Sequence, residues 1–269
     1  MLSDESQKFM SKKNKEEYKK FQKNPSFLSF HKLIKYGKIP RPHYALGLLL
    51  AAQQALDLKI KTINVLEFGC WNFDGLIDLE NYCKDINKFC EINFNVSGFT
   101  LKDGLPKYKS NVYDRMYRWS VGDYQFTKKN NIKKLKFSNI YFGDVKFTIK
   151  EFLNKNKSLE KNPIGFIAFD LDYYTSTKNA LKILKLSQNS YLPRLYSYFD
   201  DHYFSAKNEG ERKAIEEFNS INSTQISDLA EFAEQYSLYF NKWIFLGKRL
   251  KVINYFKNKH FNKRTNFFI

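Results

Sequence analysis

Five short β-rich segments alternate with helical segments, and this alternation constrains the fold more than any other feature of the chain. The segment at residues 164–170 is apolar up to its final aspartate, as expected for a central strand covered on both faces. The expected strands are TINVLEFG (62–69), NFNVSGF (93–99), SNIYFGD (138–144), IGFIAFD (164–170) and RLYSYFD (194–200). Repeated strand–helix alternation predicts an α/β domain built on a mostly parallel, doubly wound sheet.

Helical spacing of apolar residues fills the intervals between these strands. After the first strand, apolar side chains recur three and four positions apart through Leu76, Leu79, Cys83, Ile86 and Cys90, which places them on one helix face. A nearly continuous apolar stretch at 44–59 predicts a buried helix. Further helices are expected around residues 147–153, 177–186, 209–219 and 226–239. The segment KWIFLGKRLKVINYF (242–256) predicts a C-terminal antiparallel hairpin, which brings the sheet to seven strands.

The composition is strongly basic. There are 45 Lys and Arg against 28 Asp and Glu, a formal charge of +17, which attracts anions or reflects a solvated lysine-rich surface. The first 25 residues are polar and rich in lysine, so we predict a basic arm over 1–38 and one domain over 39–269. The chain has three cysteines without a CxxC pair, no apolar leader and no apolar run of membrane length. These features predict a cytoplasmic protein.

Residues that follow the strands are the candidates for a site, because ligands bind beyond the carboxyl ends of the strands in such sheets. Gly69 permits a tight turn after the first strand, although Trp71 and Phe73 stand where a dinucleotide fingerprint would have glycine. Asp144 follows the third strand. It either caps the next helix or accepts a hydrogen bond from a ribose or an adenine amine.

Four carboxylates follow the fourth and fifth strands, at Asp170, Asp172, Asp200 and Asp201. Side chains at the ends of adjacent strands would repel one another unless a cation were present. Mg²⁺ takes a few carboxylate oxygens and keeps water or substrate oxygens as its other ligands. The pattern therefore indicates a divalent metal site, with helix capping by Asp172 or Thr177 and a solvated acidic edge as the alternative.

Taken together, these segments resemble the macrocin O-methyltransferase family and related class I methyltransferases. The resemblance rests on order and spacing over roughly residues 40–220, and it implies a Rossmann-like fold with S-adenosylmethionine as methyl donor and often Mg²⁺. The segments that carry it are EFGCWNFDG, GFTLKDGLP, FGDV, FDLDYYTSTKNAL and YFDDH, preceded by RPHYALGLLLAAQQALDLKIKTINVLEFG.

The resemblance also implies roles for individual residues. Glu67 and Gly69 would lie on the cofactor's methionine side and Asp144 on its adenine side, and Trp71 would also contact the cofactor. Asp170, Asp200 and Asp201 would hold the metal. Thr100 stands where the family usually has an acidic residue for the ribose hydroxyls, and it can accept fewer hydrogen bonds than a carboxylate. Asp103 is near enough in sequence to compensate.

The function expected from the resemblance is methyl transfer to a hydroxyl of a sugar or glycan-type small molecule, with metal assistance. His202, Asp201 and Asp172 are the candidate catalytic groups. The irregular segment 101–126 could close over a sugar or an anionic group, or simply pack; its candidate contacts are Tyr113, Arg115, Tyr117, Arg118 and Trp119. We expect no specific nucleic-acid partner, while peripheral membrane contact and a homo-oligomer are compatible with the sequence.

Two other classes of function fit parts of the sequence. Asp170-Leu171-Asp172 could be the DxD of a metal-dependent nucleotide-sugar glycosyltransferase, and a dehalogenase-type phosphatase would also use DxD and a later DD. A non-catalytic basic binding module is suggested by residues 242–264, with eight Lys or Arg and no acidic residue. The same stretch can be an edge hairpin with solvated charges.

Overall fold

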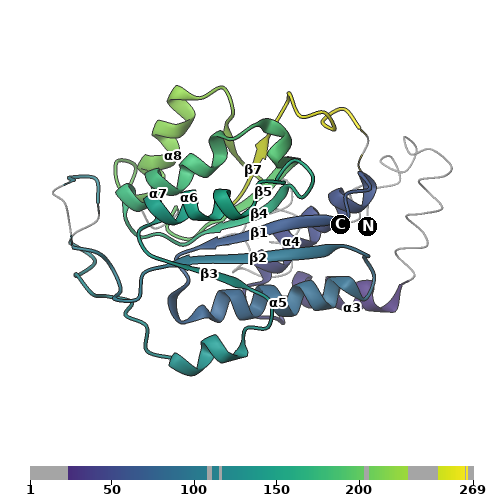
Figure 1. The fold of residues 1–269 in the computed structure, drawn as a ribbon, viewed down its shortest axis with the longest axis horizontal. Coiled ribbons are helices and arrows are strands. Elements are labelled where there is room, and N and C mark those ends of the chain that lie inside the picture. The colour runs from purple at the N-terminus through teal and green to yellow at the C-terminus, as the bar shows by residue number, and fades with distance from the viewer. Residues whose placement is uncertain are drawn as a thin grey trace.

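The computed structural model describes residues 24–107, 111–114, 117–202, 206–229, 248–263 and 265. Within these residues, seven strands form one sheet in the order β3-β2-β1-β4-β5-β7-β6 (Figure 1). The strands are β1 (Thr62–Phe68), β2 (Asn93–Thr100), β3 (Asn139–Phe142), β4 (Ile164–Phe169), β5 (Tyr191–Phe199), β6 (Ile226–Asp228) and β7 (Leu250–Asn254). Neighbours among β1 to β5 pair in parallel, whereas β7 is antiparallel to both β5 and β6. The predicted mostly parallel seven-stranded sheet is confirmed.

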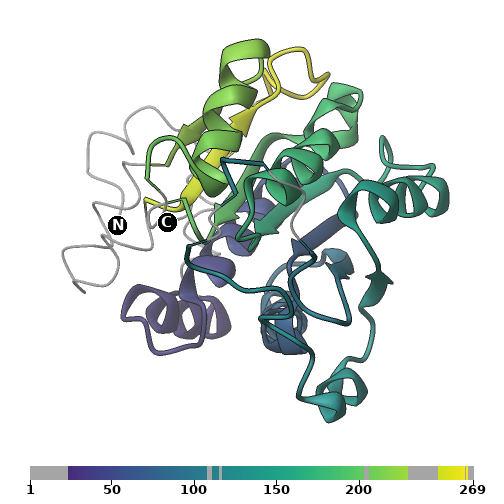
Figure 2. The same cartoon turned by 90° about the vertical axis from the view of Figure 1, so that its left-hand side faces the viewer.

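Helices cover both faces of the sheet, as the doubly wound prediction requires (Figure 2). One apolar core joins one face to the first three helices, and a second core joins the other face to the remaining helices. The helices are α3 (Pro25–Lys35), α4 (Pro42–Asp57), α5 (Asp74–Asn87), α6 (Val145–Lys155), α7 (Tyr174–Ala180) and α8 (Gly210–Ile221). In the described part of the chain, no helix combines the length and apolar character needed to span a membrane. The order reverses between β1 and β4, which places the switch point at their carboxyl ends.

The buried helix predicted at 44–59 is α4, and it lies flat against the middle of the sheet. Its contacts with β4 and β5 need a close approach, because a Cβ atom added to Gly47 would overlap the Phe166 ring. Nearly every side chain of this helix is buried, which explains its continuous apolar sequence. The amino end of α4 therefore lies under the strand ends that carry the candidate site.

The boundary predicted between residues 38 and 39 falls between α3 and α4, two helices that share one core. Helix α3 begins after the N-cap Asn24 and belongs to the domain, since Phe27, Phe30 and Ile34 are buried in the same core as α4. Phe27 and Phe30 pack against Phe89. The lysine-rich composition hid this apolar stripe. The rest of the predicted arm, residues 1–23, lies outside the described residues.

The prediction of a helix over residues 226–239 is wrong at its start. Residues 226–228 form the edge strand β6, in which Ile226 pairs with Ile253 and is buried. The antiparallel pair at the end of the sheet is therefore β6–β7, rather than a hairpin contained in 242–256. Residues 230–247, with the remainder of both predictions, lie outside the described residues.

Glu80 of α5 anchors the segment 136–138, which leads into β3. Its buried carboxylate accepts hydrogen bonds from the backbone N–H groups of Lys136, Phe137 and Ser138 and from the Ser138 hydroxyl, at 2.7–3.0 Å. Burial by itself would raise the pKa of Glu80, but these hydrogen bonds outweigh it and hold the pKa below its usual value of 4.5.

Replacing Glu80 with alanine is expected to lower the free energy of unfolding by about 3 kcal/mol, because three backbone donors lose their acceptor. Because the folded-state pKa is depressed, the stabilisation is fully present above about pH 4.5 and is lost as the pH falls through the folded value. Urea unfolding at pH 7 and at pH 3 measures both effects. Glu151→Ala, which breaks an exposed pair with Lys155, should leave the free energy of unfolding close to that of the wild type.

Candidate functional site

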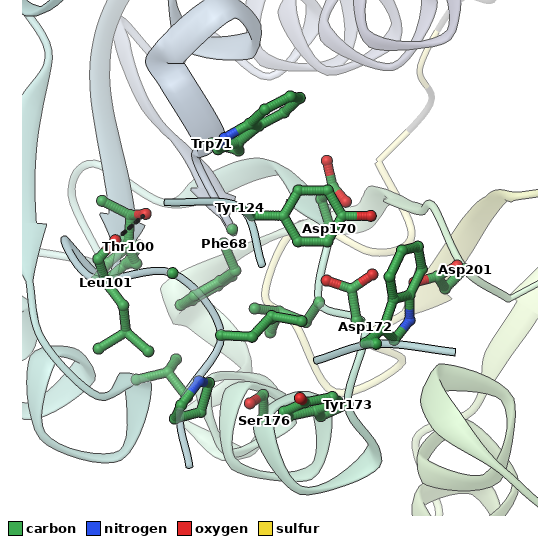
Figure 3. A pocket seen from close by; sticks show the side chains of 18 of the residues that line it. Phe68, Trp71, Thr100, Leu101, Tyr124, Asp170, Asp172, Tyr173, Ser176 and Asp201 are labelled. Carbon is green, nitrogen blue, oxygen red and sulfur yellow. Dashed lines mark hydrogen bonds between the residues drawn. The ribbon is translucent and has the colours of Figure 1, made fainter. Parts of the chain in front are cut away.

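A cavity of about 380 Å³ lies at the carboxyl ends of β1 to β5. In Figure 3, Thr100 and Leu101 lie on one side of this cavity and Asp172 and Asp201 on the other, with Tyr124 between them. The lining comes from the ends of five strands, from the starts of α6 and α7, and from the segment 101–126. Parallel strands bring these distant residues together because all their carboxyl ends meet at one edge.

The turn after β1 depends on Gly69. Its φ is +92°, and a Cβ atom built there would overlap the backbone carbonyl oxygen of Asp170. The two backbones approach so closely because the Asp170 N–H donates to the Phe68 carbonyl at 2.9 Å. Only glycine fits this position, which confirms the tight turn predicted from sequence.

Left-handed backbone follows at Asn72 and Phe73, with φ values of +55° and +60°. The buried Asn72 side chain accepts hydrogen bonds from the Thr127 and Lys128 N–H groups at 3.0 and 2.8 Å. Asn tolerates this conformation better than most residues. Asn72 thus ties the end of the irregular segment 101–126 to the turn after β1, a role that sequence analysis missed.

The segment 101–126 covers the cavity with aromatic side chains. Tyr124 has a left-handed φ of +62° and packs between Trp71 and Trp119, with ring centroids 5.3 and 5.2 Å away. Trp71 donates its indole N–H to the Gln125 carbonyl at 3.1 Å. Burial and the nearby carboxylates, Asp172 first, raise the pKa of Tyr124, so its phenol stays protonated and can donate a hydrogen bond.

The predicted contacts of this segment divide into two groups. Arg118 and Trp119 line the cavity. Tyr113 and Tyr117 instead join the segment to α8: the Gly210 N–H donates to the Tyr113 carbonyl at 2.9 Å, and the Tyr117 hydroxyl donates to Glu209 at 2.6 Å. Arg115 lies outside the described residues.

Glu211 organises the loops that follow β4 and β5. Its buried carboxylate accepts from the Leu171 N–H at 3.3 Å and from the Asp201 N–H at 2.8 Å. Burial, and then the neighbouring Asp201, raise the pKa of Glu211 well above its usual value. The sequence does carry a signal for this residue: Glu211 falls on the apolar stripe of α8, three and four residues before the buried Ala214 and Ile215.

Asp170, Asp172, Asp200 and Asp201 all line the cavity. Burial, and next Asp200 and Asp172, raise the pKa of Asp170 well above its ordinary value. Asp200 is already engaged. Its Oδ1 accepts from the Tyr198 hydroxyl at 2.7 Å and from Arg249 Nη1 at 2.9 Å. The sequence analysis did not single out Arg249, a buried residue at the start of β7.

These contacts do not fit the predicted Mg²⁺ site at Asp170, Asp200 and Asp201. A cation already faces Asp200, because the Arg249 guanidinium lies against it. Among the described residues, no three His, Cys, Asp or Glu side chains are arranged to hold a metal ion. The carboxylates were predicted to need a divalent cation, but the fold supplies a guanidinium from a strand distant in sequence.

Glu67 and His202, which were predicted to bind the cofactor and to act in catalysis, are not among the described residues that line the cavity. Glu67 accepts from the Tyr44 hydroxyl at 3.0 Å beneath the strand ends, and burial raises its pKa to about 7. Burial, and then Lys251, lower the pKa of His202 to about 4. Glu67 faces α4 because it shares its side of β1 with Ile63 and Val65.

The predicted cofactor residues Gly69, Trp71, Thr100 and Asp144 all line the cavity. Thr100 donates only a long hydrogen bond of 3.4 Å to the Leu101 carbonyl. Asp144 caps α6, since its Oδ1 accepts from the Lys146 N–H at 2.8 Å, and it faces the cavity as well. Asp103 is exposed and is not part of the lining, so its predicted compensation for Thr100 has no support in the structure.

The basic stretch 242–264 is partly internal. Arg249 and Lys251 are buried, and Lys251 pairs with Asp228 of β6. These two cations are therefore not available to a solvent-facing surface for nucleic acid or membrane. Residues 242–247 and 264 lie outside the described residues.

No protein-family model matches the chain, and no curated protein matches it. Among solved structures, it is similar to a TDP-rhamnose 3′-O-methyltransferase of calicheamicin biosynthesis, with 16% identity, coverage of 92% of this chain and 97% of that one, and a TM-score of 0.44. It is also similar to a plantazolicin methyltransferase in complex with SAH, with 9% identity, coverage of 89% and 94%, and a TM-score of 0.39. Similarity at this level does not assign a cofactor or a substrate.

Proposed function

We propose that this chain is an S-adenosylmethionine-dependent O-methyltransferase that acts on a hydroxyl of a sugar-type small molecule. The observation that carries the proposal is the two-sided cavity at the switch point of the sheet. One side holds Gly69, Thr100 and Asp144, at the positions expected for a cofactor, and the other holds Asp172 and Asp201. A single cavity with two chemically different sides suits a reaction between a nucleoside cofactor and a polar acceptor.

The cofactor side has the chemistry of a nucleoside site. Leu101, Leu105 and Val145 supply apolar surface for a flat base, while Asp144 supplies a carboxylate oxygen for an exocyclic amine. The Thr100 hydroxyl is the group at the end of β2 that can meet a ribose. Gly69 keeps the floor between β1 and β4 free of a side chain. These residues fit S-adenosylmethionine, although the Thr100 hydroxyl can accept fewer hydrogen bonds from the ribose than a carboxylate could.

The acceptor side suits a polyhydroxylated ring. Tyr124 and Trp71 present aromatic surface, and Asp172 and Asp201 present hydrogen-bond acceptors. The buried Trp119 indole N–H has no hydrogen-bond partner among the described residues, so it can donate to an acceptor oxygen. Aromatic faces combined with polar groups of both kinds match the apolar faces and hydroxyl edges of a sugar.

S-adenosylmethionine supplies an electrophilic methyl group on its sulfonium, and the protein must align an acceptor oxygen with it. Asp172 is the group that we assign to take the proton from that hydroxyl as its oxygen accepts the methyl group. The bond between that methyl group and sulfur breaks, and S-adenosylhomocysteine leaves as a neutral thioether. Asp201 binds a neighbouring hydroxyl of the acceptor, and the Tyr124 ring covers both hydroxyls. His202 has no part in this proposal because it does not line the cavity, and no step is assigned to a metal.

The proposal predicts micromolar binding of S-adenosylhomocysteine in a calorimetric titration without divalent cations. Thr100→Asp should tighten this binding by about tenfold, because a carboxylate can accept from both ribose hydroxyls. Thr100→Val should weaken it by less than about threefold, since one hydrogen bond of ordinary strength is lost. Titration with UDP-glucose is the comparison. Binding of UDP-glucose without any binding of S-adenosylhomocysteine would reject the methyltransferase proposal in favour of a nucleotide-sugar enzyme.

A further inference from the structure

Arg249 reaches the carboxylate cluster because of the direction of β7. The strands β1, β2, β4 and β5 bring their carboxyl ends to the cavity, whereas the antiparallel β7 brings its amino end to that edge. The register is fixed by pairing of Tyr198 with Leu250 and by the Phe199 N–H, which donates to the Arg249 carbonyl at 3.0 Å. A cation at the start of β7 is therefore held beside the end of β5 by the sheet itself.

The contacts of this arginine form a closed triangle. Arg249 Nη1 donates to the Tyr198 hydroxyl and to Asp200 Oδ1, both at 2.9 Å, and the Tyr198 hydroxyl donates to the same oxygen at 2.7 Å. His43 of α4 stacks on the Tyr198 ring, with centroids 4.0 Å apart, and braces it from below. Asp200 Oδ1 thus has two donors in place, which occupy both lone pairs of that oxygen.

We infer that Arg249 is the built-in counter-cation of the strand-end carboxylates, and that Asp200 is a positioning residue for it rather than a metal ligand. A guanidinium against Asp200 offsets the like-charge repulsion that would otherwise call for a divalent ion, and it repels any second cation brought to the same oxygens. Its buried position keeps water from screening this repulsion. Asp172 and Asp201 are the carboxylates that the proposed function assigns to the acceptor.

The test is a titration of the full chain with Mn²⁺, followed by loss of the free-ion signal in electron paramagnetic resonance. The wild type is expected to show no saturable binding at millimolar Mn²⁺. Arg249→Met removes the cation while keeping much of the side-chain volume, and it should gain binding of at least about tenfold higher affinity. Adding Asp200→Asn to that variant should abolish the gain, which locates the ion at Asp200.

Arg249→Lys is the matched control, because it keeps the charge and should exclude Mn²⁺ as the wild type does. A thermal unfolding transition checks that each variant folds, and Arg249→Gln replaces Arg249→Met if that variant does not. Saturable Mn²⁺ binding by the wild type would overturn the inference. The inference would also be overturned if Arg249→Met or Arg249→Gln folds but binds Mn²⁺ no better than the wild type. A parallel titration with S-adenosylhomocysteine reports on the proposed function separately, so the two can fail independently.

Discussion

Replacing Gly69 with alanine is expected to abolish cofactor binding and to destabilise the protein. The position combines a φ of +92° with a close backbone contact, because a Cβ atom would overlap the Asp170 carbonyl oxygen. Asp170 directly follows β4 in the middle of the sheet, so its backbone cannot shift to make room. We expect the free energy of unfolding to fall by at least about 3 kcal/mol and the affinity for S-adenosylhomocysteine to fall by more than about 100-fold. Urea unfolding and calorimetric titration measure the two quantities.

Gly143→Ala is the matched control for Gly69→Ala. Gly143 also follows a strand, lines the cavity and has a positive φ of +142°, but its added Cβ would meet only the Thr148 methyl group, at 3.3 Å. Its substitution should therefore cost about 1–2 kcal/mol, mainly from backbone strain. Equal losses in both variants would show that the close approach of β1 and β4 is not what makes glycine necessary at position 69.

The second large effect is expected at Asp172. Asp172→Asn keeps the shape of the side chain but removes its capacity to take a proton, so methyl transfer should slow by about 10²–10⁴-fold. Binding of S-adenosylhomocysteine should stay within about twofold of the wild type, because Asp172 lies across the cavity from Thr100, on the side that we propose for the acceptor. The assay follows release of S-adenosylhomocysteine with a panel of nucleotide sugars and glycans as acceptors.

Asp103→Asn provides the comparison for Asp172→Asn. This carboxylate follows β2 but is exposed and outside the cavity lining, so its removal should leave both turnover and cofactor affinity unchanged. An Asp172→Asn enzyme with normal turnover would rule out Asp172 as the base and direct attention to Asp201. Loss of cofactor affinity in this variant would instead mean that Asp172 belongs to the cofactor side.

The proposed pairing of Arg249 with Asp200 at the strand ends affects the experiments on both Gly69 and Asp172. Glu211 holds the backbone after β4 and β5 by accepting from Leu171 and Asp201, while Arg249 faces Asp200. Asp172 and Asp201 thus stand in a site whose backbone and charge are already held by neighbouring groups. This arrangement is what a reaction that depends on positioning requires, because the protein needs little reorganisation when the acceptor binds.

The sequence by itself determined the α/β class, the five parallel strands and most of the cavity lining. Apolar runs and helical spacing report burial along the chain, and parallel strands necessarily collect the residues that follow them at one edge. For that reason the positions of Gly69, Thr100, Asp144 and Asp172 along the chain were enough to predict that they share one cavity.

The tertiary structure alone decided which way the side chains face and which distant groups meet. Glu67 faces α4 because strand residues alternate between faces, and the sequence does not say which face is which. Arg249 meets Asp200 across 49 positions, and Glu211 meets Leu171 across 40. Such contacts follow from the antiparallel register of β7 and the packing of α8, which are set by the whole fold. The local pattern places Glu211 on the buried stripe of α8 but does not identify its partners.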